Sequence, residues 1–321
     1  MTPAPASVRF CGLELAHPIV NGSGTFDAIA ARRTFGDALL EAFPFSAFVS
    51  KTITLAPRVG NPPPRLWETP AGMINSIGLP NRGLAGYLEH DLPQLAQLPV
   101  PLITNVMGPT ADEVGRLVEA LGERDEIAAI ELNVSCPNVS TGLDIGADPE
   151  SLAALVRAVR PLTAKPLIVK LTPNTADVAA VAVAAEAEGA DAVSLINTLR
   201  AMAFEPGRRG AQARPWLGGG TGGLSGPAIR AVALAQVAAV ARRVAVPIVG
   251  MGGVASGEHA WELLGAGATL VAVGTASFRD PAAGARIASE LKSLQNAKTP
   301  STSVKRDEAQ VEVDMNSSDS G

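Results

Sequence analysis

Cysteine and aromatic residues are both scarce in this sequence of 321 residues. There are two cysteines, Cys11 and Cys136, and aromatic residues make up 4% of the chain. Two cysteines provide neither a disulfide framework nor a metal cluster, so we expect a reducing, cytoplasmic compartment and no bound metal. With so few aromatic residues, a hydrophobic core has to consist mainly of alanine, valine, leucine and isoleucine.

The sequence also lacks a surplus of positive charge and a long apolar run. The formal net charge is −5, which leaves no excess of basic residues to neutralise nucleic-acid phosphates. No run of about 18 apolar residues is free of glycine, proline and turn signals, so no membrane span is predicted. The first residues, MTPAPASVRF, do not have the pattern of a signal peptide. We therefore expect no nucleic-acid partner and no membrane association.

Short apolar runs rich in β-branched residues alternate along the chain with helical patterns. Eight runs predict strands, at 18–21, 47–52, 101–107, 128–135, 166–171, 192–197, 247–252 and 270–276. The helical patterns lie at 28–42, 83–95, 111–121, 149–159, 176–188, 227–242, 257–264 and 281–291. Strands that alternate with helices pair in parallel through right-handed crossovers. Eight such units in about 250 residues predict an α/β fold, a single (β/α)8 TIM barrel within residues 1–295. A doubly wound open sheet is the structural alternative.

Three other kinds of segment do not belong to this alternation. Residues 7–15 predict a small hairpin before the first barrel strand. Two long connections, 53–81 after the second strand and 199–226 after the sixth, are expected to be active-site loops, because barrel sites lie at the C-terminal ends of the strands. The tail 296–321 is polar and aperiodic, and we expect it to be disordered.

Polar residues and glycines stand where most of the predicted strands end. The polar ones are Lys51, Thr52, Asn105, Asn133, Lys170, Asn197 and Thr198. Strand capping explains one or two such residues, but Lys or Asn at five of eight strand ends favours a site-lining role. Amide groups match both the N–H and the C=O groups of a planar lactam, and lysines stabilise an anion.

Glycine-rich segments follow the last two predicted strands, as PIVGMGGVASG and VAVGTA. Backbone N–H groups in such loops bind phosphate, and barrels frequently hold a phosphate at this position. Two dinucleotide-type glycine patterns also occur, at 218–223 and 250–255. Neither has an acidic residue about 20 positions further on to bind a ribose. A phosphate-bearing cofactor is therefore predicted, and NAD binding by this chain is not favoured.

Cys136 lies in the segment ELNVSCPNV, directly after the fourth predicted strand. It stands among polar residues at the expected functional face, whereas Cys11 in the hairpin fits an inert buried thiol. A thiolate at the barrel mouth can act as a nucleophile or a base. No neighbouring histidine is available to activate it as in papain-like enzymes, so a base role is favoured. We interpret all three histidines as structural: His17, His90 and His259.

Taken together and in this order, the motifs resemble those of the dihydroorotate dehydrogenases. The resemblance runs from about Val8 to Leu291 and rests on KT at 51–52, NSIGLPN at 75–81, NVSCPNV around Cys136, INT at 196–198, GGLSGPAI at 222–229, GMGGV at 250–254 and VGTA at 273–276. Within class 1 of the family, the chain most resembles the NAD-linked subclass 1B catalytic subunit. It departs from the usual pattern in NGSGTF at 21–26 and in STGLDIG at 140–146.

The resemblance implies an FMN-dependent oxidation of (S)-dihydroorotate to orotate in de novo pyrimidine biosynthesis. It implies that Cys136 is the general base, where the membrane-linked class 2 enzymes have serine. It implies substrate contacts from Lys51, Asn75, Ser76, Ile77, Gly78, Leu79, Asn133, Asn197 and Thr198. It implies FMN contacts from Ser23, Lys51, Thr52, Asn105, Asn133, Lys170, Ile196, Gly226, Gly252, Gly253, Gly274 and Thr275.

Resemblance to subclass 1B also implies a partner, an iron–sulfur flavoprotein subunit that carries FAD and a [2Fe–2S] cluster and passes electrons to NAD. The implied assembly is a homodimer of this chain within a heterotetramer. A [2Fe–2S] cluster needs about four ligands, usually cysteines, so two cysteines cannot hold it. The alternatives are a fumarate-linked class 1A enzyme, a dihydropyrimidine dehydrogenase-like flavin barrel, a lyase that uses Lys170 as a Schiff base, and a non-catalytic binding subunit.

Overall fold

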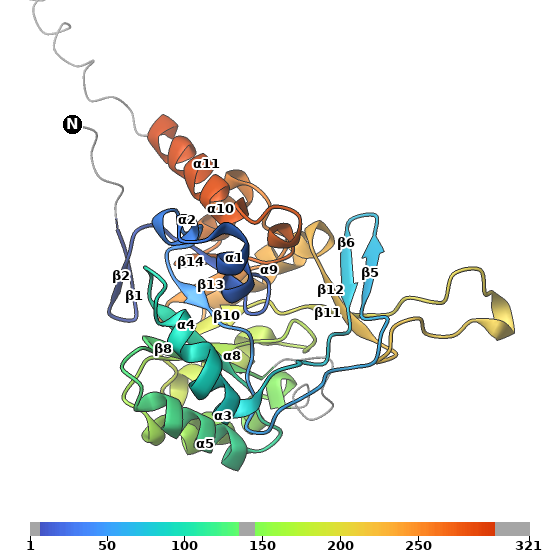
Figure 1. Cartoon of the computed structure of the whole chain (residues 1–321), viewed down its shortest axis with the longest axis horizontal. Coiled ribbons are helices and arrows are strands. Elements are labelled where there is room, and N and C mark those ends of the chain that lie inside the picture. The colour runs from blue at the N-terminus through green and yellow to red at the C-terminus, as the bar shows by residue number, and fades with distance from the viewer. Residues whose placement is uncertain (1–6, 135–144, 299–321) are drawn as a thin grey trace, which may run out of the picture.

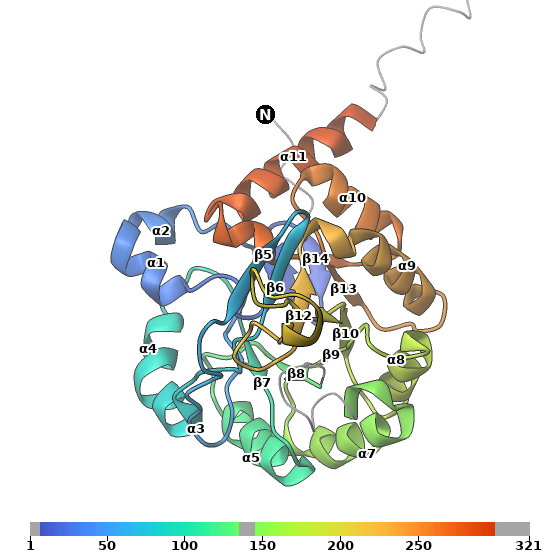
Figure 2. The same cartoon turned by 90° about the vertical axis from the view of Figure 1, so that its right-hand side faces the viewer.

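The computed structural model describes residues 7–134 and 145–298, in which eight parallel strands form a barrel (Figures 1 and 2). The strands are β3 (Ile19–Asn21), β4 (Phe48–Val49), β7 (Leu102–Val106), β8 (Ala129–Asn133), β9 (Leu167–Lys170), β10 (Ala192–Leu195), β13 (Ile248–Met251) and β14 (Leu270–Val273). Their order in the sheet is β3-β14-β13-β10-β9-β8-β7-β4. Each strand lies within one of the eight predicted ranges, and the predicted fold is confirmed.

A side chain closes the barrel at the seam between β3 and β4. Among the described residues no backbone ladder pairs these two strands. The fully buried amide of Asn21 replaces it, because its Oδ1 accepts from the Val49 N–H and its Nδ2 donates to the Val49 C=O, both at 2.8 Å. Below this point, the Ser46 N–H donates to the Ile19 C=O at 3.0 Å. The sheet is therefore a closed barrel, and the open-sheet alternative is wrong.

Helices surround the barrel, as the end-on view in Figure 2 shows. They are α1 (Ala28–Phe35), α2 (Ala38–Glu41), α3 (Gly83–Gly86), α4 (Leu92–Leu95), α5 (Ala111–Gly122), α7 (Pro149–Val159), α8 (Val178–Ala187), α9 (Arg230–Ala241), α10 (Gly257–Gly265) and α11 (Ala283–Lys298). Several begin at a side-chain cap, because the side chains of Thr110, Asp148 and Ser256 accept backbone N–H groups of the first turn.

Two predicted helices are interrupted, and α11 is longer than predicted. The pattern at 28–42 is divided at Gly36, which has a φ of +65°. The pattern at 83–95 contains a π-helical turn at Tyr87–Asp91, just before Pro93, which has no N–H to donate to the preceding turn. α11 continues to Lys298, past the predicted boundary at residue 295, and residues 299–321 lie outside the described part.

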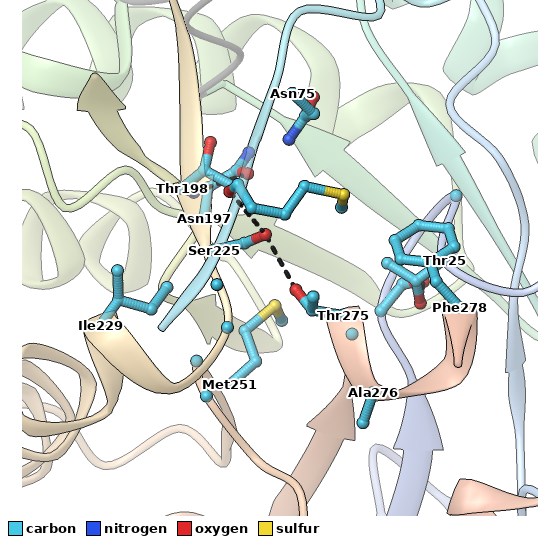
Figure 3. Close-up of a pocket in the computed structure, with 18 of the residues that line it drawn as sticks. Thr25, Asn75, Asn197, Thr198, Ser225, Ile229, Met251, Thr275, Ala276 and Phe278 are labelled. Atoms are coloured by element: carbon cyan, nitrogen blue, oxygen red, sulfur yellow. Dashed lines mark hydrogen bonds between the residues drawn. The ribbon is translucent and has the colours of Figure 1, made fainter. Parts of the chain in front are cut away.

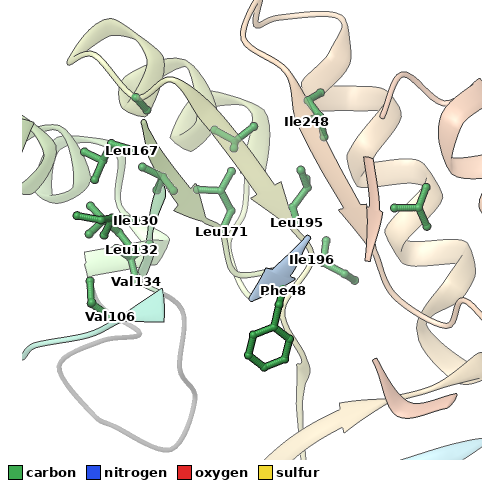
Figure 4. Close-up of a cluster of buried hydrophobic side chains, with 14 of the residues drawn as sticks. Phe48, Val106, Ile130, Leu132, Val134, Leu167, Leu171, Leu195, Ile196 and Ile248 are labelled. Carbon is green, nitrogen blue, oxygen red and sulfur yellow. The ribbon is translucent and has the colours of Figure 1, made fainter. Parts of the chain in front are cut away.

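The apolar core has two parts, one on each face of the barrel wall. Outward-facing strand residues such as Ile130, Leu132 and Leu167 pack against the helices (Figure 4). Inward-facing residues, which include Ile103, Ala129 and Ile168, fill the barrel interior. The predicted hairpin is present as β1 (Val8–Phe10) and β2 (Leu13–Leu15), and it covers the N-terminal end of this interior with the buried side chains of Phe10 and Leu15.

The two long connections form a second sheet, which the sequence did not predict. Its strands are β11 (Leu199–Ala201), β12 (Gly222–Ser225), β6 (Gly72–Asn75) and β5 (Leu66–Thr69), all antiparallel in that order. We call it the mouth sheet, because Figure 2 shows it in front of the C-terminal end of the barrel. The segment between β11 and β12 extends away from the barrel (Figure 1). No helix in residues 7–134 or 145–298 is long and apolar enough to cross a membrane.

Candidate active site

A cavity of about 1220 Å³ lies between the C-terminal ends of the barrel strands and the mouth sheet. Strand ends supply its floor, and β5, β6 and β12 contribute to the opposite wall. The predicted site residues that line it are Ser23, Lys51, Thr52, Asn75, Ile77, Gly78, Leu79, Asn133, Lys170, Ile196, Asn197, Thr198, Gly226, Gly252, Gly253, Gly274 and Thr275. Predicted site residues from nine different segments of the chain thus converge on a single space, as a barrel mouth allows.

Three predicted site residues are not among those that line the cavity. Cys136 lies outside the described residues. Ser76 is fully buried beside the cavity, where its Oγ donates to the Thr221 C=O at 2.8 Å and accepts from Asn61 Nδ2 at 3.2 Å. Ser76 therefore joins the two long connections to each other. The third residue, Asn105, lies in the barrel interior, one layer below the floor.

Ammonium and amide groups form the floor of the cavity. Asn133 and Lys170 stand opposite each other on β8 and β9, and Lys170 is only 6% exposed. Asn133 Nδ2 donates to Thr52 Oγ1 at 3.4 Å, and the hydroxyl of Ser23 lies at the same distance from Thr52 Oγ1. Lys51 follows β4 and lines the same space. The floor therefore offers positive charge together with hydrogen-bond donors and acceptors to a polar, anionic ligand.

Below the floor, a buried carboxylate links three strands inside the barrel. Glu131 on β8 is 3% exposed, and its Oε1 accepts from Asn105 Nδ2 on β7 at 2.5 Å. Its Oε2 accepts from the Ser194 hydroxyl on β10 at 2.7 Å. The other amide atom of Asn105, Oδ1, is buried and has no partner among the described residues. A buried acceptor without a donor is rare in a folded protein, so this atom points to an absent ligand group or water.

Glycine backbones border the side of the cavity that lies beyond β13 and β14. Gly226, Gly252 and Gly253 all have positive φ values, which residues other than glycine rarely adopt. A Cβ on Gly253 would lie 2.9 Å from the Gly226 carbonyl oxygen, so these two loops pack backbone to backbone. At Gly274, by contrast, the nearest atom to an added Cβ is 3.7 Å away. This arrangement leaves room for an anion to approach the backbone closely.

Several residues that line the cavity were not predicted from the sequence. Among them, Thr25, Ser225, Met251 and Phe278 are drawn in Figure 3, where the Thr275 hydroxyl donates to Ser225 Oγ at 2.8 Å. Arg286 reaches the cavity from α11. Ser225 and Met251 lie within the motifs GGLSGPAI and GMGGV, whereas no motif or strand end marks Phe278 or Arg286, which reach the cavity from the segment after β14 and from the last helix.

The shifted pKa values of Cys11 and His17 belong to residues away from the cavity. Burial, with a smaller effect of the Asp191 charge, raises the pKa of the Cys11 thiol to about 12. Burial also lowers the pKa of His17, whose Nδ1 accepts from the Ile19 N–H. His259 similarly accepts from the Ala255 N–H through Nδ1. These contacts support the interpretation of Cys11 as an inert thiol and of these two histidines as structural.

The chain is similar to proteins of one family along almost its whole length. The sequence model described as "Dihydroorotate dehydrogenase" matches residues 6–294. The "Dihydroorotate dehydrogenase B (NAD(+)), catalytic subunit" of Citrifermentans bemidjiense is 46% identical over 89% of this chain and 92% of that protein. The protein of the same name from Trichlorobacter lovleyi is 47% identical over 90% of this chain and 92% of its own length. That from Desulforudis audaxviator is 46% identical over 89% of this chain and 91% of its own length.

Proposed function

This chain belongs to the dihydroorotate dehydrogenase family, and from that premise we propose that it oxidises dihydroorotate to orotate in de novo pyrimidine biosynthesis, with FMN bound at the barrel mouth. Family membership confirms the resemblance stated from the motifs. The observation that carries the proposal is the cavity, which collects nearly all of the predicted ligand-binding residues from strand ends far apart in the sequence. The substrate is an anionic cyclic ureide, and the amides and lysines of the floor have the complementary chemistry.

The residues present fit FMN in three respects. The volume of about 1220 Å³ accommodates a flavin together with a second planar ligand. The backbones of Gly252, Gly253, Gly274 and Thr275 would hold the phosphate. The unpartnered Oδ1 of Asn105 supplies an acceptor near the floor, and an isoalloxazine ring carries one N–H donor. When bound, the flavin supplies the acceptor for the hydride that leaves the substrate.

We assign substrate binding to the part of the cavity near the loop that follows β6. Asn75, Asn133 and Asn197 line the cavity and would bind the N–H and C=O groups of the ureide. Lys51 would pair with negative charge on the substrate and the cofactor. Burial in the cavity strengthens such polar contacts because water is excluded.

Cys136 is proposed as the general base that removes the proton from C5 of dihydroorotate. Among the described residues that line the cavity there is no histidine, and the two carboxylates, Glu68 and Asp280, are paired with Arg279 and Arg286. These carboxylates are therefore poor bases. We expect Cys136→Ala to lower turnover by roughly a hundredfold or more while FMN stays bound. Full turnover in this variant, measured beside an unchanged flavin spectrum, would exclude the assignment.

The fate of the electrons is also proposed from the relatives. Their names describe a catalytic subunit and NAD(+). We propose that electrons pass to NAD through a partner iron–sulfur flavoprotein that holds FAD and a [2Fe–2S] cluster. The assembly would be a cytoplasmic heterotetramer built on a dimer of this chain. The two cysteines of this chain are too few to ligate the cluster.

The absorbance spectrum of the purified chain, before and after anaerobic addition of dihydroorotate, tests the central proposal. We expect flavin bands that bleach on addition of dihydroorotate and not on addition of dihydrouracil, which lacks the carboxylate. A flavin that only dihydrouracil bleaches would assign another pyrimidine substrate. A protein that cannot be loaded with FMN contradicts the proposal. Reoxidation of the bleached protein by fumarate alone would identify the class 1A alternative.

A further inference from the structure

Glu131 is a buried ionisable group for which neither the proposed base nor the ligand contacts give a role. It stands directly opposite Asn105 in the parallel register of β7 and β8. Its side chain also reaches Ser194 on β10, across the intervening strand β9. A carboxylate at this depth costs free energy unless its oxygens are satisfied, and here each oxygen accepts one hydrogen bond.

This pairing determines which way the Asn105 amide faces. At 2.5 Å from Glu131 Oε1, the Asn105 side chain must present its NH2 group, because the opposite orientation would place two acceptor oxygens in contact. The amide oxygen is consequently turned away from Glu131, and it is this oxygen that is left without a partner. Glu131 therefore converts an amide that can face either way into a fixed acceptor.

The Asn105 backbone places this acceptor next to the cavity floor. Its N–H donates to Ser50 Oγ at 3.1 Å, and its C=O accepts from the Ile53 N–H at 3.0 Å. Ser50 and Ile53 flank Lys51 and Thr52, both of which line the cavity. Asn105 is thus bonded on both sides to the segment on which the ligand would rest.

On the basis of the FMN site proposed above, we infer that Glu131 is a positioning residue for the flavin. It acts through Asn105, whose Oδ1 it holds as an acceptor for the single N–H of the isoalloxazine ring. It needs no contact with the substrate or the flavin. The role depends on the acceptor that Glu131 presents to Asn105, and not on its negative charge.

Four variants separate this role from a general effect on the fold. Glu131→Met removes the acceptor with little change in size. Glu131→Gln keeps an acceptor for Asn105 and can donate to the Ser194 hydroxyl, which can itself accept. Asn105→Ala removes the positioned amide. Ser194→Ala is the matched control, because it removes the other hydrogen bond of Glu131 and leaves the one to Asn105.

The measurement is the dissociation constant of FMN, from quenching of its fluorescence on titration into the apoprotein of each variant. We expect Asn105→Ala and Glu131→Met each to weaken binding by roughly tenfold, the size of one buried hydrogen bond. The double variant should bind about as weakly as either single variant, because both changes remove the same contact. Glu131→Gln and Ser194→Ala should stay within about threefold of the wild type.

Two results would overturn the inference. One is a further tenfold loss when Glu131→Met is added to Asn105→Ala, since the two residues would then act independently. The other is an equal loss in Glu131→Gln and Glu131→Met, which would assign the effect to the charge. Far-UV circular dichroism of each variant identifies a folding defect. If Glu131→Met does not fold, a tenfold loss of FMN affinity in Glu131→Gln alone overturns the inference. If the wild-type apoprotein does not bind FMN, the proposed function itself fails.

Discussion

Replacing Asn21 by alanine should open the seam of the barrel and destabilise the whole chain. The substitution removes both hydrogen bonds to Val49, and with them the partners of a buried backbone N–H and a buried C=O. Each buried backbone group left without a partner costs about 1–3 kcal/mol, so the expected loss of unfolding free energy is about 2–6 kcal/mol. A total stability near the lower end of the usual range of about 5–15 kcal/mol would not tolerate a loss of about 6 kcal/mol.

Guanidinium unfolding of the FMN-free protein, followed by far-UV circular dichroism, measures this loss. Asn296→Ala is the matched control, because Asn296 is exposed on α11 and its replacement should change stability by no more than about 0.5 kcal/mol. Since Ser23 and Lys51 follow the two sides of the seam, FMN affinity should fall along with stability. A loss below about 1 kcal/mol in Asn21→Ala would refute the idea that this amide closes the barrel.

Three further predictions concern the two thiols, Gly253 at the proposed phosphate site, and the pH dependence of stability. Because burial raises the pKa of Cys11 to about 12, iodoacetamide at pH 8 should label Cys136 alone, and mass spectrometry showing carbamidomethyl Cys11 in the folded protein would contradict this. Gly253→Ala should weaken FMN retention by tenfold or more, measured by dialysis, because its φ is +71° and the new Cβ would press on the Gly226 carbonyl. Burial lowers the pKa of His17 below its ordinary 6.5, so the unfolded chain takes up its proton first as pH falls. The stability that His17 contributes is therefore present above pH 6.5 and lost below it, and His17→Gln should show a shallower decline in acid unfolding titrations.

The barrel could be predicted from the sequence because each of its strands is an apolar run bounded by turn residues. The run at 128–135, for example, contains β8, and its polar end at Asn133 marks the side on which the cavity lies. Position at a strand end is a local property, and it needs no knowledge of which strands are neighbours. For this reason most of the predicted site residues do line one cavity.

The mouth sheet could not be predicted because its strands have little strand character of their own. β6 (GMIN) and β12 (GGLS) are short and rich in glycine, and they pair across roughly 150 positions of sequence. Gly223 must be glycine because its backbone lies close to Thr198, and a side chain at this position would clash with Thr198. In a single sequence, such glycines are indistinguishable from those of an irregular loop.

Polar strand residues divide into two groups that the sequence does not separate. Lys51 and Asn133 face the cavity, whereas Asn21 closes the seam and Glu131 bonds within the barrel interior. All four stand in or just after apolar runs. Asn21 bonds along the sheet to the Val49 backbone, whereas Glu131 and Asn133 point inward at different heights in the barrel. That height depends on the stagger between neighbouring strands.

The mouth sheet has a consequence for the order in which ligands exchange. Its strand β12 leads into Gly226 at the proposed cofactor end, where Ser225 accepts from Thr275. Its strand β6 leads from Asn75 into the proposed substrate-binding segment, which ends at Leu79. Because one hydrogen-bonded ladder joins the two ends, a flavin in place would hold this segment in register before any substrate arrives. FMN should then stay bound over many turnovers, while substrate binds to and product dissociates from a site that is already preorganised.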